Sequence, residues 1–223
     1  MRGNCTHRTS RCSDARDYRA RLRECCRQHV ITVTTAVAEA FTEAGITWWA
    51  DYGTLLGAVR NPLTTWADYP WLPQSDTPIA PGIIPHDKDS DFGAMEDDWK
   101  LAVHTLRRLA AKRSFNLVER VNSGSMKMRL SRLNHSNVDI FFWSNDNGTM
   151  RRKHYIGVDR FKGRDFPASM IEPMGSVEWE GVTLPAPNDP AVFLAMRYGP
   201  NWLTPVMANN DGVPRANHPV VVA

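Results

Sequence analysis

The stretch PHDKDSDFG, residues 85–93, decides how the rest of the chain can be interpreted. Side chains alternate between the two faces of an extended segment, so Asp87, Asp89 and Asp91 would form an acidic row on one side of a strand. Such a row is unfavourable through mutual repulsion unless cations neutralise it. The pattern therefore predicts a divalent-metal site, for Mg²⁺ or Mn²⁺, and favours phosphate chemistry at this strand.

A fourth carboxylate fits the same site. Asp139 stands between Val138 and Ile140, which would point into the core and leave Asp139 on the opposite face of its strand. Carboxylates on neighbouring strands can hold one or two hard cations together with substrate phosphates. We expect Asp89, Asp91 and Asp139 to be catalytic residues. The expected metal ligands are Asp87, Asp89, Asp91 and Asp139.

Two simpler interpretations compete with this metal site. One is an acidic surface loop. The other is a calcium loop, since the three aspartates fit its positions 1, 3 and 5. Phe92 then stands where that loop needs Gly, Asp98 stands where Glu is usual, and the Pro-rich segment before it leaves no entering helix. These departures count strongly against the calcium loop.

The segment GTLLG, residues 53–57, precedes the acidic row. A glycine followed by a hydroxyl residue at a helix start offers N–H groups and a hydroxyl to a phosphate. The same pair is also an ordinary helix start. We expect Gly53 to make the turn, Thr54 to cap a short helix, and both to bind the donor phosphates.

The basic residues are unevenly distributed. The chain has 27 Lys and Arg against 24 Asp and Glu, and fifteen of the 27 lie between Lys100 and Arg164. A basic region beside an acidic metal site suits an anionic substrate such as a nucleotide diphosphate, although a solvated surface is an equal alternative for any one residue. The candidates for holding donor phosphates are Arg60, Lys127 and Arg129.

Length and composition suit one globular domain. The chain has 223 residues, of which 42% are hydrophobic and 23% are charged. No segment approaches the roughly 20 apolar residues that span a bilayer. The N-terminus is polar and Arg-rich, without the apolar stretch of a signal peptide. We predict a cytoplasmic protein with no nucleic-acid partner, which would meet a membrane-bound acceptor only at the surface.

The four cysteines are all near the start, at Cys5, Cys12, Cys25 and Cys26. Their spacing matches no zinc pattern, and adjacent residues on a helix point about 100° apart, which makes poor co-ligands. The spacing favours free thiols over a disulfide or a metal site.

The apolar pattern predicts an α/β (α+β) domain built around a mixed sheet flanked by helices. Residues 15–44 are expected to be helical, with Val30, Val33, Val37 and Phe41 on one apolar face. We expect strands at 46–50, 89–95, 115–121, 126–133, 138–143 and 150–158, a hairpin at 177–184, and helices at 96–112 and 190–198.

Residues 61–85 form a Pro- and Trp-rich insert, expected to be a long loop. Its Trp66, Tyr69 and Trp71 could form a box for a quaternary ammonium group, although such rings more often pack on the core. The predicted organisation is a polar tail at 1–15, one domain at 16–203 that includes the insert, and a C-terminal tail at 204–223.

Three motifs together resemble the LicD family. They are YGTLLGAVR at 52–60, IPHDKDSD at 84–91 and RYGPNW at 197–202. That family includes bacterial phosphocholine transferases and is related to fukutin and fukutin-related protein. The resemblance runs from about Ala40 to Trp202. It implies a nucleotidyltransferase-like fold and metal-dependent transfer of a phospho-alcohol, such as phosphocholine, from a CDP-activated donor to a sugar hydroxyl of a glycan or glycolipid.

The resemblance also implies roles for single residues. Asp89 and Asp91 match the family's metal-binding Asp-x-Asp pair, and Asp87 matches its preceding acidic position. Gly53 and Thr54 match the glycine-hydroxyl turn. Asp139 stands where the wider fold places its third carboxylate.

The chain departs from the family pattern in two places. About two dozen residues separate Arg60 from the acidic run, where a short connection is usual, and His86 replaces a common Trp. The insert could rebuild the acceptor pocket without disturbing the metal chemistry. Two other functions stay open: a nucleotidylyltransferase that uses a nucleoside triphosphate, and a non-catalytic protein of the same fold that binds a nucleotide or glycan.

Overall fold

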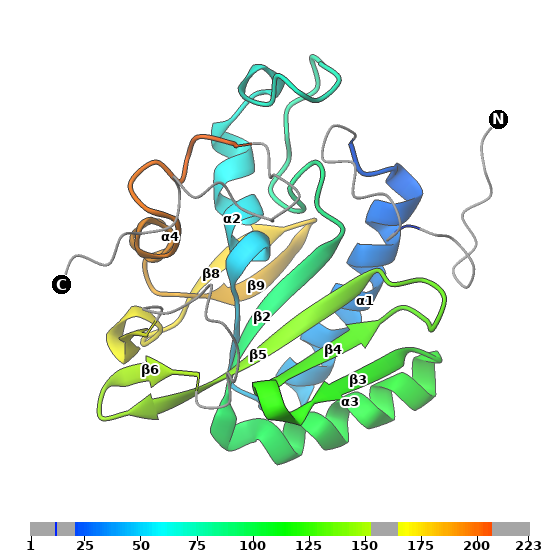
Figure 1. Ribbon diagram of the computed structural model, residues 1–223, viewed down its shortest axis with the longest axis vertical. Helices are drawn as coiled ribbons and strands as arrows, with labels where there is room; N and C mark the ends of the chain where they lie inside the picture. Colours follow the sequence, from blue (N-terminus) through cyan, green and yellow to red (C-terminus); the bar gives the residue numbers. More distant parts are fainter. Residues whose placement is uncertain (1–11, 13–20, 153–164, 207–223) are drawn as a thin grey trace.

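A mixed β-sheet forms the centre of the protein, seen in a computed structural model that describes residue 12 and residues 21–152 and 165–206 (Figure 1). The strand order is β1-β2-β5-β4-β3, extended by β6 beside β5 and by β7 beside β6. Strands β8 and β9 form a separate hairpin. The bounds are β1 Trp48–Ala50, β2 Asp89–Met95, β3 Asn116–Arg120, β4 Ser125–Arg129, β5 Asn137–Asp146, β6 Thr149–Arg151, β7 Phe166–Pro167, β8 Gly175–Trp179 and β9 Val182–Ala186.

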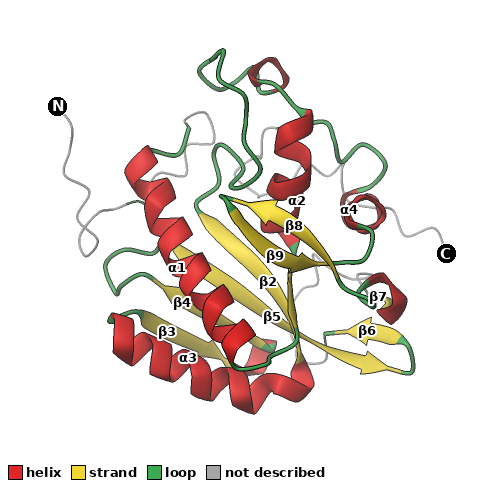
Figure 2. Cartoon of the chain, turned by 180° about the vertical axis from the view of Figure 1, so that it is seen from behind, coloured by secondary structure: helices red, strands yellow, loops and turns green. Residues whose placement is uncertain are grey.

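Helices cover both faces of the sheet. Figure 2 shows α1 and α3 lying across one face, and Figure 1 shows α2 in front of the other. The helices are α1 Glu24–Glu43, α2 Tyr52–Arg60, α3 Trp99–Arg113 and α4 Pro190–Tyr198. This arrangement confirms the predicted α/β (α+β) class with a mixed sheet flanked by helices.

The register of β2 against β5 positions the acidic residues. The two strands run parallel, with Asp91 opposite Asp139 and Asp89 opposite Asn137. Ser90 points toward α1, because its hydroxyl lies 2.6 Å from the hydroxyl of Thr34. Since side chains alternate along a strand, Asp89 and Asp91 point to the other face, where α2 begins.

The apolar face predicted for the first helix is confirmed, since Val30, Val33, Val37 and Phe41 are all fully buried. The helix itself begins at Glu24; residues 21–23 are not helical, and the rest of the expected start lies outside the described residues. Strand β6 ends at Arg151, and most of the strand expected at 150–158 also lies outside them. The predicted polar tail, except for residue 12, and the predicted C-terminal tail beyond residue 206 also lie outside the described residues.

Gly93 lies under the indole ring of Trp49, its cross-strand neighbour on β1. A Cβ at residue 93 would collide with three ring atoms of Trp49, which is itself fully buried. We expect Gly93→Ala to lower the free energy of unfolding by about 1–3 kcal/mol, as overpacking does. Thermal or denaturant unfolding measures this. The double variant Gly93→Ala/Trp49→Phe should lose less than the sum of the two single changes, because the smaller ring leaves room; strict additivity would contradict the packing explanation.

The insert at 61–85 is a loop with two short 3₁₀ turns, Asn61–Leu63 and Trp66–Asp68. The side-chain amide of Asn61 donates to the carbonyl oxygens of Ala80, Gly82 and Ile83 at 3.1–3.3 Å, so the insert returns along α2 toward the acidic row.

The rings of the insert pack on the protein. Tyr69 is fully buried, and the guanidinium of Arg21 lies 3.5 Å from the ring centroid of Trp66. The guanidinium of Arg60 lies 5.9 Å from the ring centroid of Tyr69. Because the protein's own cations already face these rings, the structure favours packing over a box for a quaternary ammonium group.

The free thiols that the spacing favoured are not what the structure contains. Cys12 and Cys26 form a disulfide with Cα atoms 5.4 Å apart, and Cys25 is also disulfide-bonded. Residues 12 and 26 come together because Cys12 lies beside the first turn of α1, which sequence spacing does not reveal. In the described part of the chain, no helix is both long enough and apolar enough to cross a membrane.

Candidate active site

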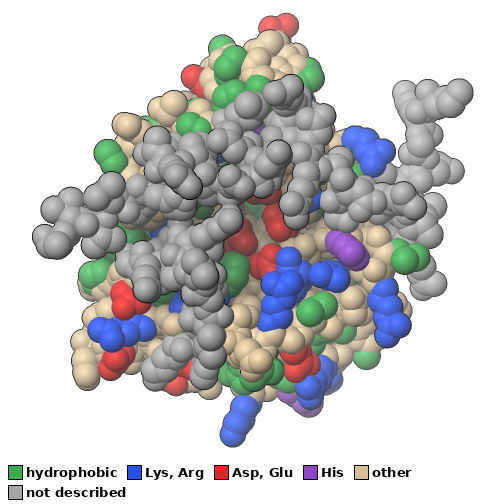
Figure 3. All heavy atoms as spheres, viewed as in Figure 1, with side chains coloured by type: hydrophobic (Ala, Val, Ile, Leu, Met, Phe, Trp, Pro, Cys, Tyr) green, Lys and Arg blue, Asp and Glu red, His purple; other side chains and the backbone are tan. Residues whose placement is uncertain are grey.

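Four aspartates converge where β2 and β5 begin. Asp91 and Asp139 are direct neighbours across the two strands. Asp87 precedes β2 and interacts with Asp89 through both charge and a side-chain hydrogen bond. Figure 3 shows acidic side chains gathered at the centre of this face with Lys and Arg side chains directly beside them. We call Asp87, Asp89, Asp91 and Asp139 the acidic cluster.

The carboxyl groups of the acidic cluster are buried and repel one another. Burial is the main cause that raises the pKa of Asp87 and of Asp91 well above the usual range, and the charge of Asp89 is the next cause for both. Asp139 and Asp87 raise the pKa of Asp91 further. Burial also raises the pKa of Asp139, against the attraction of Lys127. Carboxyl groups in this situation are stabilised by any positive charge that reaches them.

The start of α2 lies directly on the acidic cluster. The N–H of Gly53 donates to Asp91 Oδ2 at 3.2 Å. A Cβ at residue 53 would lie 2.8 Å from Asp87 Oδ2 and 3.4 Å from Asp91 Oδ2. Glycine is therefore required here, because the backbone lies directly against the carboxylates. The N–H of Gly53 binds Asp91, whereas in a phosphate-binding loop it would point to the ligand.

The helix cap is Asp51, so the prediction that Gly53 makes the turn and Thr54 caps the helix was wrong. Asp51 is the N-cap of α2, and its Oδ1 accepts from the N–H of Tyr52 at 2.8 Å. Gly53 and Thr54 lie inside the first turn. The Thr54 hydroxyl accepts from the N–H of Asp91 at 2.7 Å, which ties α2 to β2.

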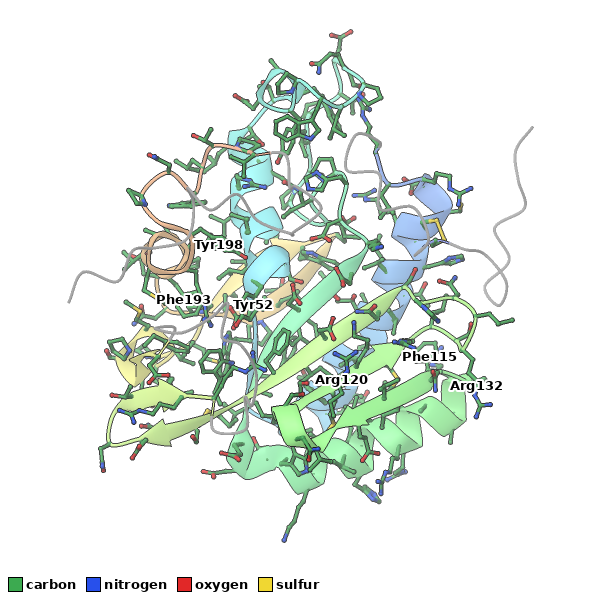
Figure 4. The ribbon with its side chains drawn as sticks, viewed as in Figure 1. Tyr52, Phe115, Arg120, Arg132, Phe193 and Tyr198 are labelled. Atoms are coloured by element: carbon green, nitrogen blue, oxygen red, sulfur yellow. A yellow bond between two sulfur atoms is a disulfide. The ribbon has the colours of Figure 1, made fainter. Side chains whose placement is uncertain are left out.

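Basic side chains border the acidic cluster on β4 and β3. Lys127 Nζ lies 2.7 Å from Asp139 Oδ2, an ion pair in which both side chains are 15% exposed. Arg129 lies opposite Asn137, on the same face of β4 as Lys127. Arg120, labelled in Figure 4, lies near enough to Asp139 for its charge to lower the pKa of that carboxyl. Arg120 was missed in the sequence, because only the β3–β4 pairing places it there.

Arg60 lies apart from these cations. It is seven residues beyond Gly53, or about 10 Å along α2. Its side chain is 6% exposed, and Nη1 donates to the carbonyl oxygen of Trp202 at 3.4 Å. Burial of His86, and then the positive charge of Arg60, lower the pKa of His86 to about 4. Arg60 thus contacts the insert and the segment after α4, and its predicted role in binding donor phosphates stays a prediction.

A separate cavity of about 570 Å³ lies between α1, the end of α3 and the loop after β4. Phe115 and Arg132 line it, and Figure 4 shows both well away from Tyr52 at the start of α2. This cavity is not part of the acidic cluster.

The residue types of the acidic cluster fit a divalent cation. Carboxylate oxygens are the ligands that Mg²⁺ and Mn²⁺ prefer, and their mutual repulsion would be relieved by binding. Among the described residues, no three Asp, Glu, His or Cys side chains are arranged to hold one ion together. Instead, Asp87 shares a hydrogen bond with Asp89, and Lys127 lies against Asp139. The carboxylates of the cluster therefore lie in close pairs, and Lys127 offsets part of their charge.

Asp89 and Asp91 on β2 and Asp139 on the parallel β5 have the arrangement that the resemblance to a nucleotidyltransferase-like fold implied. Residues 80–189, about half of the chain, match the family described as LicD/FKTN/FKRP, nucleotidyltransferase domain. The chain belongs to the LicD family, as its motifs predicted.

Two curated proteins are similar over a longer stretch. Both are named Ribitol 5-phosphate transferase FKRP, one from Homo sapiens and one from Mus musculus. Each is 25% identical over 180 residues, which cover 79% of this chain and 32% of the relative. The chain thus spans about a third of the length of these relatives.

Two solved structures show a distant likeness. The lincosamide antibiotic adenylyltransferase LnuA has a TM-score of 0.41 at 11% identity, covering 70% of this chain and 78% of that one. The antibiotic-resistance factor ANT(2'')-Ia also has a TM-score of 0.41, at 8% identity, covering 72% of this chain and 66% of that one. Scores this low add nothing to the family assignment.

Proposed function

We propose that this protein is a metal-dependent transferase that moves a phospho-alcohol group from a CDP-activated donor to a sugar hydroxyl of a glycan or glycolipid. The observation that carries the proposal is the convergence of four repelling carboxylates beside Gly53, bordered by Lys127 and Arg120. A site that only bound a neutral ligand would have no physical reason to keep these carboxylates together. Family membership and the similarity to ribitol 5-phosphate transferases support the same reaction.

The acidic cluster would hold one or two Mg²⁺ or Mn²⁺ ions through Asp87, Asp89, Asp91 and Asp139. A bound divalent ion would polarise the donor diphosphate and offset the charge that develops during transfer. Arg120, Lys127 and Arg129 present positive charge along the same face of the sheet to the donor phosphates. We assign to Asp139, held by Lys127, the task of orienting or deprotonating the acceptor hydroxyl.

Ribitol 5-phosphate is the first candidate for the transferred group, because it appears in the names of the similar curated proteins. Phosphocholine, which the family resemblance suggested, is the second. The loop at 61–85 ends two residues before Asp87 of the acidic cluster and is the segment we expect to contact the acceptor.

Product analysis tests this function. The protein is incubated with CDP-ribitol, CDP-choline or CDP-glycerol and a glycan acceptor, with Mg²⁺ or with a chelator. We expect metal-dependent release of CMP and a mass gain on the acceptor equal to the phospho-alcohol. Pyrophosphate release from a nucleoside triphosphate would instead establish nucleotidyl transfer, and nucleotide binding without turnover of any donor would establish a binding protein.

The disulfides bear on where the protein works. Disulfides persist in oxidising compartments and are rare in the cytosol, where thiols are kept reduced. The Cys12–Cys26 disulfide and the disulfide-bonded Cys25 therefore favour an oxidising compartment over the cytoplasmic location that the sequence predicted. Thiol labelling of the protein from its native source tests this. Labelling of the cysteines before any reduction would support the cytoplasmic location instead.

A further inference from the structure

Arg197 lies inside the protein although it carries a charge. It belongs to α4 and is 1% exposed. Its Nη2 donates to Asp51 Oδ2 at 2.9 Å, and the side chain of Asp51 is completely buried. An arginine keeps its charge in proteins, so its burial depends on a partner of opposite charge. Asp51 is that partner, 146 residues away in the sequence.

Aromatic rings enclose the rest of the guanidinium. Its Cζ lies 4.7 Å from the ring centroid of Tyr52, 4.8 Å from Trp143, 4.9 Å from Phe193 and 5.0 Å from Phe166. Figure 4 shows Tyr52 and Phe193 close together where α2 and α4 meet. Nε and Nη1 have no hydrogen-bond partner in the part of the chain that the structure describes. Arg197 is thus closed off from the surface and acts on Asp51 and on the rings, which leaves it no direct contact with a substrate.

Asp51 in turn connects to the acidic cluster. Its N–H donates to the carbonyl oxygen of Asp91 at 3.1 Å, and its charge is one of those that raise the pKa of Asp91. As N-cap of α2 it also sets the position of Gly53, whose N–H donates to the Asp91 carboxylate. Without Arg197, Asp51 would add an uncompensated negative charge against Asp91.

Tyr52 shows how firmly this connection is fixed. Its φ of 42° is unfavourable for a residue with a side chain, and such conformations persist only where the surroundings determine them. The ring contacts the guanidinium of Arg197 and packs edge-to-face with the ring of Phe141, with the two ring centroids 5.2 Å apart. The backbone between Asp51 and Gly53 is therefore held in place from the side of α4.

We propose that Arg197 is a positioning residue that neutralises and orients Asp51 and, through Asp51 and the start of α2, sets the geometry in which the acidic cluster receives a divalent cation. This inference rests on the proposed function for the cation, but not on the identity of the donor or acceptor. The competing explanation is purely structural, with Arg197 only fastening α4 to the sheet.

The test uses two variants and a matched control. Arg197→Lys keeps the charge but loses the planar fork. Asp51→Asn/Arg197→Met removes both charges together, so that no unpaired charge stays buried. The control is Arg107→Lys on α3, which loses the same planar fork in a two-bond ion pair with Glu119, across the sheet from the cluster. Circular dichroism and the melting temperature report folding, and calorimetric titration with Mn²⁺ in the absence of donor and acceptor reports cation affinity.

We expect the two test variants to fold and to bind Mn²⁺ about tenfold more weakly than the wild type, with a similar loss in kcat and little change in KM for the donor. Arg107→Lys should keep the wild-type Mn²⁺ affinity and kcat. Wild-type Mn²⁺ affinity in either folded test variant would overturn the proposal. If both variants are largely unfolded, wild-type Mn²⁺ affinity in the fraction that stays native would also overturn it. A wild type that binds Mn²⁺ but turns over no CDP-alcohol would overturn the proposed function and leave this inference to be decided by the titration.

Discussion

Asp91→Asn is expected to lower turnover by about 10³-fold or more while leaving the protein folded. Asp91 receives the repulsion of Asp89, Asp139, Asp87 and Asp51. Replacing the carboxylate by an amide weakens one expected metal ligand. The transition state would then lose about 4 kcal/mol of charge stabilisation, which corresponds to a 10³-fold lower rate. The same change relieves repulsion in the free protein, so the melting temperature should stay unchanged or rise.

The measurement is steady-state CMP release under saturating Mg²⁺, paired with thermal unfolding. Asp97→Asn is the matched control, because Asp97 is exposed in the 3₁₀ turn Glu96–Asp98 that follows β2. It should keep wild-type turnover. Wild-type rates in Asp91→Asn, or a collapse of stability that explains the loss of rate, would contradict the assignment of Asp91 to the reaction.

Gly53→Ala is expected to lower turnover by about 10²-fold without weakening α2. Alanine favours a helix over glycine by about 0.5–1 kcal/mol, so the backbone change alone is stabilising. The added methyl group, however, would lie 2.8 Å from Asp87 Oδ2, and the carboxylate must move away from it. A displacement of the order of 1 Å at a catalytic group costs about this factor in rate.

The result is checked by comparing kcat, the melting temperature and far-ultraviolet circular dichroism of Gly53→Ala with those of Glu39→Ala. Glu39 is exposed on α1, so this control introduces an alanine into a helix far from the cluster. An unchanged kcat in Gly53→Ala would mean that the position of Asp87 does not matter for the reaction. A large fall in melting temperature would mean that the contact is structural.

The strand that carries the acidic pair could be predicted from local pattern alone. Aspartates at alternating positions indicated an extended segment, and the predicted bounds, 89–95, are those of β2. The apolar face of α1 followed from helical spacing, and the bounds of α4 followed from Pro190 in its first turn and Gly199 after its end. Each of these depends only on residues a few positions apart.

The parts that the sequence did not reveal depend on contacts between distant segments. The ion pair of Asp51 with Arg197 and the disulfide of Cys12 with Cys26 exist only once the chain has folded. The position of Arg120 beside Asp139 requires the register of three strands. Asp51 is the exception, since an aspartate directly before a helical run is a usual N-cap signal and could have been chosen over Thr54.

The proposed phosphoryl chemistry requires the acidic cluster to bind a divalent cation. Mn²⁺ is titrated into the wild-type protein and into Asp89→Asn/Asp91→Asn, and binding is followed by the loss of the free-ion electron paramagnetic resonance signal. We predict saturable binding by the wild type and none by the double variant at the same concentrations, with both proteins folded. Equal binding by the two proteins, or no binding by the wild type with donor present, would contradict the claim.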